Sequence, residues 1–153
     1  MLVTYRWSAE RDALVLTVEV EPEGTWTVPL PRLGLRMAVP AEVTDVEWFG
    51  GGPGEAYADF HQAAVIGRHW SSVDGLQTPY VRPQENGNRT GVRWAELRGP
   101  GGGVRVEGEP TVELTVRRWT SEELDAADHT TDLVAGDRVH VNLDLAQAEL
   151  GSE

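Results

Sequence analysis

Residues 138–145 read RVHVNLDL, a stretch that indicates the class of the fold. Apolar side chains occupy every second position in it: Val139, Val141, Leu143 and Leu145. Because successive side chains of a β-strand point to opposite faces, this spacing predicts a strand with one buried face. The same period of two recurs over residues 14–20 and 112–116.

Five other stretches have the residue types of strands and are bounded by glycine, proline or polar turns. They are residues 2–7, 25–30, 43–49, 90–97 and 103–108. Residues 99–103, GPGGG, are short enough for a hairpin turn. Long helical patterns do not alternate with these strands, so we predict an all-β fold, a large antiparallel β-sandwich.

One short helix is predicted where the chain reads TSEELDAADH from residue 120. Thr120 has the side chain of an N-cap, and Glu123 is spaced to reach back to it in a capping box. Acidic residues in the first turn suit the positive end of the helix dipole.

Length and composition limit the chain to a single domain over residues 1–153, without a disulfide framework. The chain has 153 residues, 40% of them hydrophobic, and no cysteine. Its formal net charge of −12 repels phosphate backbones and anionic lipid, so nucleic acid and membrane are not expected partners. The sequence shows no membrane-spanning run and no secretion signal, and we expect a cytoplasmic location.

Residues typical of a catalytic centre do not converge in the sequence. Cysteine is absent, no G-x-S-x-G elbow occurs, and the four histidines are scattered, so we expect no nucleophilic triad and no metal site. The glycine-rich residues 49–55 lack the Lys-Ser/Thr ending of a phosphate-binding loop and are interpreted as a strand exit. Paired acids are plentiful, but capping and solvation explain them better than glycoside hydrolysis.

Tryptophan is abundant, with six in the chain. Four lie inside predicted strands, where core packing is the favoured interpretation: Trp7, Trp26, Trp48 and Trp94. Trp70 lies in RHWSSVD, residues 68–74, which shows no strand pattern. Of the six, Trp70 is therefore the tryptophan that we most readily place at a surface, where an aromatic face can stack on a sugar.

Two long motifs stand out in the sequence: VEWFGGGPGEAYADF at residues 46–60 and TPYVRPQENGNRTGVRW at residues 78–94. They resemble the C-terminal domain of the large β-galactosidases of glycoside hydrolase family 2. Residues 32–37, RLGLRM, and the helical region after residue 115 resemble the same family. The resemblance covers most of the chain.

The resemblance implies a large antiparallel sandwich of the galactose mutarotase-like type, in an enzyme that hydrolyses terminal β-D-galactosides with retention. The catalytic glutamates of that family lie on a (β/α)8 barrel, which needs about 250 residues that this chain lacks. We therefore expect a C-terminal fragment, inactive alone, that ends before its last strands. The substrate-stacking tryptophan of the family would come from a loop that begins near residues 145–153, where the chain ends, so it cannot be assigned.

The resemblance also implies cofactors and partners. Magnesium and sodium ions are expected mainly at the barrel, and none in this domain. The expected partners are the remainder of the parent chain and a galactoside, in a homo-oligomeric parent enzyme.

The motif at residues 78–89 has the residue types of a rigid loop beside the substrate pocket. Gly87 permits a left-handed turn, and Glu85 and Arg89 are expected to pair. We expect Glu85, Asn86 and Arg89, together with Trp70, at the edge of the substrate pocket. Two alternatives stay open: a free-standing carbohydrate-binding module, and a pure interaction domain with an apolar patch for docking.

Overall fold

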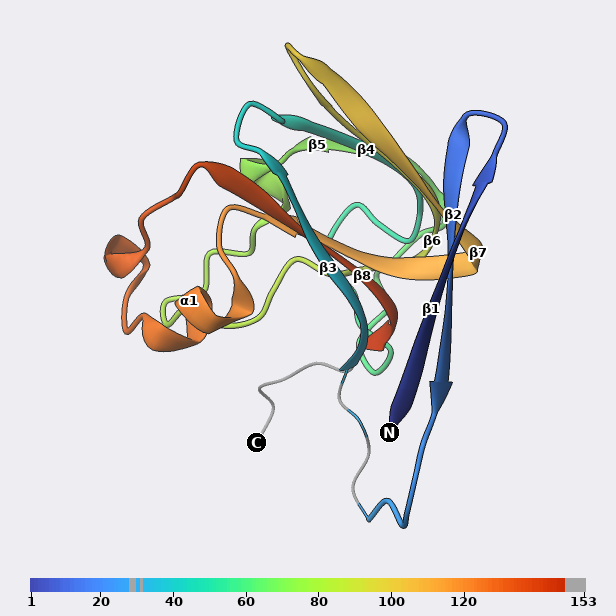
Figure 1. The fold of residues 1–153 in the computed structure, drawn as a ribbon. Coiled ribbons are helices and arrows are strands. Elements are labelled where there is room, and N and C mark those ends of the chain that lie inside the picture. The colour runs from blue at the N-terminus through green and yellow to red at the C-terminus, as the bar shows by residue number, and fades with distance from the viewer. Residues whose placement is uncertain (28–29, 31, 148–153) are drawn as a thin grey trace.

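The computed structural model describes residues 1–27, 30 and 32–147, which form two antiparallel β-sheets (Figure 1). The strands are β1 (Leu2–Glu10), β2 (Ala13–Glu21), β3 (Arg32–Pro40), β4 (Asp45–Gly50), β5 (Gly67–Ser72), β6 (Arg89–Gly99), β7 (Gly102–Arg117) and β8 (Arg138–Gln147). One helix is present in this part, α1 (Ser121–Ala126), with 3₁₀ turns at Asp74–Leu76 and Thr130–Asp132. The predicted all-β antiparallel class with one short helix is confirmed.

The larger sheet has six strands in the order β3-β8-β7-β6-β4-β5. Residues of β3 and β4, which are not neighbours in this order, belong to one hydrophobic cluster, so the sheet curves around its apolar face. Val46, Trp48, Leu97 and Val141 are fully buried in that cluster. The period of two that predicts β8 therefore reflects a real buried face, with Val139 and Val141 inside.

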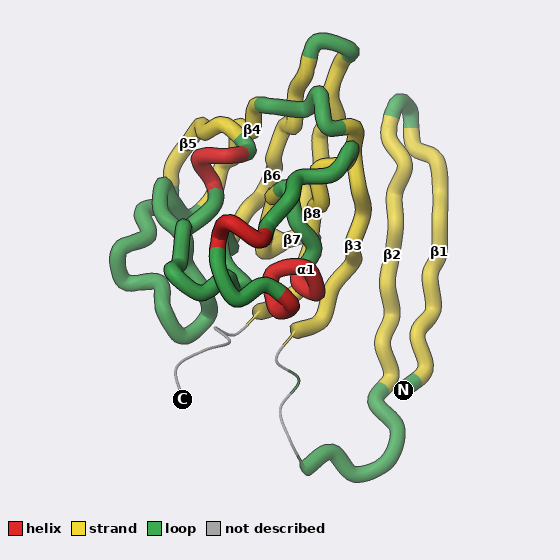
Figure 2. Tube along the Cα trace, turned by 90° about the vertical axis from the view of Figure 1, so that its left-hand side faces the viewer, coloured by secondary structure: helices red, strands yellow, loops and turns green. Residues whose placement is uncertain are grey.

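The strands β1 and β2 form a separate hairpin and pair only with each other among the described residues. Figures 1 and 2 show this hairpin set to one side of the six-stranded sheet, and residues 22–31 connect β2 to β3. All nine residues of β1 are exposed. Trp7 is 64% exposed and Trp26 is 43% exposed, so the expectation that both lie in the core is wrong; Trp48 alone among the four strand tryptophans is fully buried.

Several strand boundaries differ from the prediction. Residues 25–27 are not in a strand, contrary to prediction, and residues 28 and 29 lie outside the described part. The two segments predicted at 103–108 and 112–116 belong to one long strand, β7, whose ladder with β6 is interrupted by bulges. The hairpin turn at residues 99–103 is confirmed, since Gly99 pairs with Gly102.

The capping box predicted at Thr120 is confirmed. The Thr120 hydroxyl accepts from the Glu123 amide at 3.2 Å, and the Thr120 amide donates to Glu123 Oε2 at 2.7 Å. Within residues 1–27, 30 and 32–147, no helix has the length and apolar run that a membrane span requires.

Candidate functional site

The two motifs of the sequence lie against each other in the structure, joined mainly through Glu55. Its Oε1 accepts from the Tyr80 hydroxyl at 2.5 Å, and its Oε2 accepts from the Gly87 amide at 2.8 Å. A backbone hydrogen bond also connects the two motifs: the Ala56 amide donates to the Asn88 carbonyl at 2.9 Å. The residues of the first motif thus hold the second motif in place.

Gly87 occupies the left-handed position that its sequence context predicts. Its φ is 81°, and a Cβ added there would lie 3.0 Å from the Leu76 carbonyl oxygen. A residue other than glycine would therefore be strained on both counts.

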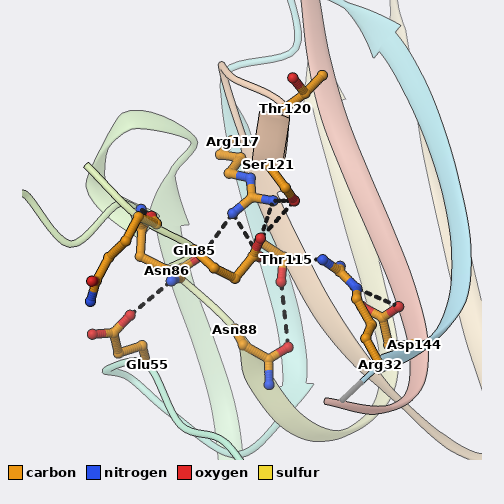
Figure 3. A network of polar contacts seen from close by, with 12 residues as sticks. Arg32, Glu55, Glu85, Asn86, Asn88, Thr115, Arg117, Thr120, Ser121 and Asp144 are labelled. Carbon is orange, nitrogen blue, oxygen red and sulfur yellow. Dashed lines mark hydrogen bonds and ion pairs between the residues drawn. The ribbon is translucent and has the colours of Figure 1, made fainter. Parts of the chain in front are cut away.

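Glu85 lies at the centre of a buried polar cluster (Figure 3). Its carboxylate accepts two hydrogen bonds from Arg117 of β7, at 2.7 and 3.0 Å, and one from the Ser121 hydroxyl at 2.6 Å. Arg32 of β3 lies 3.4 Å away and forms two hydrogen bonds with Asp144 of β8. The cluster therefore ties the segment at residues 78–89 to β3, β7, β8 and the start of α1.

The expected pairing of Glu85 with Arg89 is wrong. Glu85 pairs with Arg117, while the Arg89 guanidinium donates to the carbonyl oxygens of Pro53 at 3.0 Å and Gly87 at 2.8 Å. Arg89 also lies over the Trp48 ring, 5.4 Å from its centroid. Because Arg89 pairs with Leu114 in the ladder, its side chain points to the core face of the sheet, where Trp48 also lies.

The electrostatics of this cluster follow from its burial. Burial alone acts to raise the pKa of Glu85, but hydrogen bonds and charge from Arg117, with Ser121 and Arg32, outweigh it and hold the pKa below its ordinary value. Burial lowers the pKa of Arg89 to about 10. Glu113, which accepts from Asn88 and from the Gln147 amide, has its pKa raised, mainly by burial.

Asn86 is buried and has a structural role. Its Oδ1 accepts from the Thr78 amide at 3.1 Å, and its Nδ2 donates to the Gln84 carbonyl at 2.9 Å. These two bonds close the loop between residues 78 and 86 on itself. Val81 at the tip of that loop is 88% exposed.

Trp70 lies apart from this cluster. It is 64% exposed, as predicted for a surface residue, but it lies inside β5 and not in an irregular segment. β5 is one edge of the six-stranded sheet, while β3, which supplies Arg32, is the other. Trp70 lines a shallow depression with Asp45 and Arg98. The structure therefore brings Glu85 and Asn86 together, with Arg89 on the opposite face of the sheet, and leaves Trp70 at a separate surface.

Sequence reasoning missed most partners in the buried cluster. Arg32, Asp144 and Arg117 come from strands distant in sequence from Glu85, so no local spacing points to them. Asn88 lies within the second motif, but its partners Glu113 and Thr115 are distant. The sequence did offer a signal for Glu55, because this residue lies within the first motif.

In the part that the structure describes, no group of three or more histidine, aspartate or glutamate side chains could hold a metal ion. Most of the residues around 145–153, where the resemblance places the start of a substrate-facing loop, lie outside the described part.

Comparison with known proteins identifies a family whose match includes both motifs. A family model described as "Beta galactosidase small chain" matches residues 1–153. The chain belongs to this family. A β-galactosidase of Arthrobacter sp. strain B7 is 35% identical over 156 residues, which cover 98% of this chain and 15% of that protein.

Other members of the family align over most of this chain. A β-galactosidase of Vibrio cholerae is 41% identical, with 82% of this chain and 12% of the relative covered. One of Priestia megaterium is 39% identical, with 83% and 12% covered. The chain thus spans only 12% to 15% of the length of these relatives.

Proposed function

We propose that residues 1–153 act as an accessory domain of a β-galactosidase that hydrolyses terminal β-D-galactosides by a retaining mechanism. The observation that carries this proposal is the match to a small part of much longer proteins named β-galactosidase. The retaining pair of glutamates would lie in a barrel outside this segment. The parent would be a cytoplasmic homo-oligomer, with magnesium and sodium ions at that barrel.

The charged groups of the buried cluster support an accessory role. The carboxylates of Glu85 and Asp144 are held by arginines, with side chains 6% and 2% exposed. A general acid must reach the glycosidic oxygen, and a nucleophile must reach the anomeric carbon. Carboxylates fixed in this way stabilise the arrangement of the strands and do not reach a substrate.

The proposal is tested by assaying a nitrophenyl β-D-galactoside with the full-length protein and with residues 1–153 alone. We expect hydrolysis by the full-length protein and none by the segment. The proposal would be contradicted by a purified full-length protein that cleaves no β-galactoside, or by a segment that cleaves one unaided.

We further propose that the domain forms part of the wall of the substrate pocket. Glu85, Asn86 and Arg89 would act as positioning residues at the pocket edge, because they are buried and fix the loop whose exposed tip is Val81 and Arg82. Contact with the substrate would then come from the tip and not from the buried cluster.

The pocket-wall role predicts that Val81→Ala and Arg82→Ala in the full-length enzyme raise KM and leave thermal stability unchanged. Val134→Ala is the matched control, since Val134 is 82% exposed on another loop. Arg89→Ala should change KM through the position of the tip. If both tip variants have the KM of the control, and if Arg89→Ala also leaves KM unchanged, the role is excluded.

A second candidate, a carbohydrate-binding module, is favoured by Trp70. Its exposed ring lies beside Asp45 and Arg98, which offer an acceptor and donors for sugar hydroxyls. This candidate predicts that galactose or lactose binds the segment and that Trp70→Ala abolishes binding. Titration calorimetry that detects no heat of binding with either sugar would exclude it.

A further inference from the structure

The hairpin β1–β2 has two chemically different faces. Directly opposite residues in its ladder point to the same side, so the register assigns each side chain to a face. One face carries the apolar pairs Val3–Val20, Tyr5–Val18, Trp7–Leu16 and Ala9–Leu14. The other face carries Leu2–Glu21, Thr4–Glu19, Arg6–Thr17, Ser8–Val15 and Glu10–Ala13, with an ion pair between Arg6 and Glu19 at 3.2 Å.

Residues 1–27, 30 and 32–147 leave most of the apolar face exposed. Tyr5 is 56% exposed, Trp7 is 64% exposed and Leu14 is 76% exposed. A two-stranded hairpin alone in water is marginally stable, and burying one large apolar side chain stabilises by about 1.5–3 kcal/mol. A continuous apolar face of this kind is therefore expected to be covered in the working protein.

The outer face of the six-stranded sheet does not suit this hairpin. Across β4, β5, β6 and β7 that face carries a ladder of linked charges: Arg68, Glu47, Arg98, Glu96, Arg105 and Glu107. Covering these groups with apolar side chains would remove them from water without new partners. The opposite, concave face is already filled by the hydrophobic cluster.

A second copy of the chain is also a poor fit. Each strand has nine residues. At about 3.4 Å per residue and about 5 Å between strands, one face of the hairpin covers roughly 300 Å². A stable interface between separate molecules buries about 800 Å² on each partner. The net charge of −12 adds repulsion between copies.

A segment of the same polypeptide can bind a face of this small area, because a covalent connection raises the effective concentration of the two surfaces. The relatives have the length for such a segment, because the aligned region is only 12% to 15% of their length. We propose that the apolar face of β1–β2 packs face to face on an apolar β-sheet that the parent chain supplies outside residues 1–153. This inference rests on the proposed function for the existence of the longer chain.

The test compares two neighbouring positions of β2 in the full-length protein. Leu16→Lys places a charge on the apolar face, and Thr17→Lys places the same charge on the polar face. Hydrogen exchange measured by mass spectrometry over residues 1–21 should lose about tenfold or more of its protection in Leu16→Lys and little in Thr17→Lys. Equal protection in both variants would overturn the proposal.

A second measurement avoids substitutions that could prevent folding. Hydroxyl-radical labelling of Trp7 and Tyr5 in the unmodified full-length protein should be about tenfold or more slower in buffer than in urea. Labelling in buffer close to the rate in urea overturns the proposal. Protection that disappears on dilution overturns it as well, because it identifies a second copy as the occupant.

The same preparation is assayed for β-galactoside hydrolysis. An active enzyme with a freely labelled Trp7 contradicts the interface alone. An inactive protein with a protected Trp7 contradicts the proposed function alone.

Discussion

Among the residues that the structure describes, Arg117 and Glu85 form the most buried ion pair, with side chains 1% and 6% exposed. Removing one partner of a buried ion pair costs up to about 3–5 kcal/mol, although Arg32 at 3.4 Å and the Ser121 hydroxyl would still contact Glu85. We therefore expect Arg117→Met in the full-length protein to lower the opening free energy of residues 78–89 by up to that amount, as measured by hydrogen exchange. Arg105→Met is the control, because its side chain is 43% exposed, and little change is expected there.

Glu85 and Glu113 should respond to pH in opposite directions. The pKa of Glu85 is lowered on folding, so its contribution to stability is present above its ordinary pKa and is lost as pH falls through the folded value. The pKa of Glu113 is raised mainly by burial, so its contribution is present at low pH and is lost as pH rises through the folded value. At pH 7, Glu85→Gln should lower the thermal midpoint, and Glu113→Gln should leave it unchanged or raise it. An equal fall in both variants would refute this assignment.

For individual residues, the sequence predicts contacts between neighbours in the chain and fails for contacts between residues that are distant in sequence. Thr120 and Glu123 are three residues apart, and the predicted capping box is present. Glu85 and Arg89 are four residues apart and seemed a natural pair, but a strand begins at Arg89 and turns its side chain to the core. The partner of Glu85, Arg117, is 32 residues away.

Among the elements, the segment at residues 78–89 depends on one backbone conformation. Gly87→Ala adds a Cβ at a left-handed φ of 81° and close to the Leu76 carbonyl. The left-handed conformation alone costs about 1–2 kcal/mol for a residue with a side chain. We expect hydrogen exchange of residues 78–89 in the full-length protein to accelerate accordingly. Gly54→Ala should not change it, since nothing lies within 4 Å of a Cβ there.

Strands with a buried face and a clear alternation are predicted well, as β4, β6 and β8 show. β5 lacks this signal, because its residues GRHWSS are partly exposed along an edge and carry few apolar side chains. The pattern in β1 and β2 correctly indicates strands but misplaces Trp7, because alternation shows that a face is apolar and not what covers it.

For the whole molecule, the all-β class follows from the pattern, but the strand order does not. The order β3-β8-β7-β6-β4-β5 results from contacts between distant segments, such as Arg32 with Asp144, which no window of sequence contains. The family resemblance of the motifs also has a physical basis, because their residues bind each other through Glu55.

The accessory role of this domain is tested by the rate of β-galactoside hydrolysis by the full-length protein before and after deletion of residues 1–153. We expect hydrolysis by the intact protein and its loss on deletion, because the proposed role of the domain is to complete the pocket wall without supplying catalytic groups. Hydrolysis that continues at the same kcat/KM without the segment, or an intact protein that does not act on β-galactosides, would contradict it.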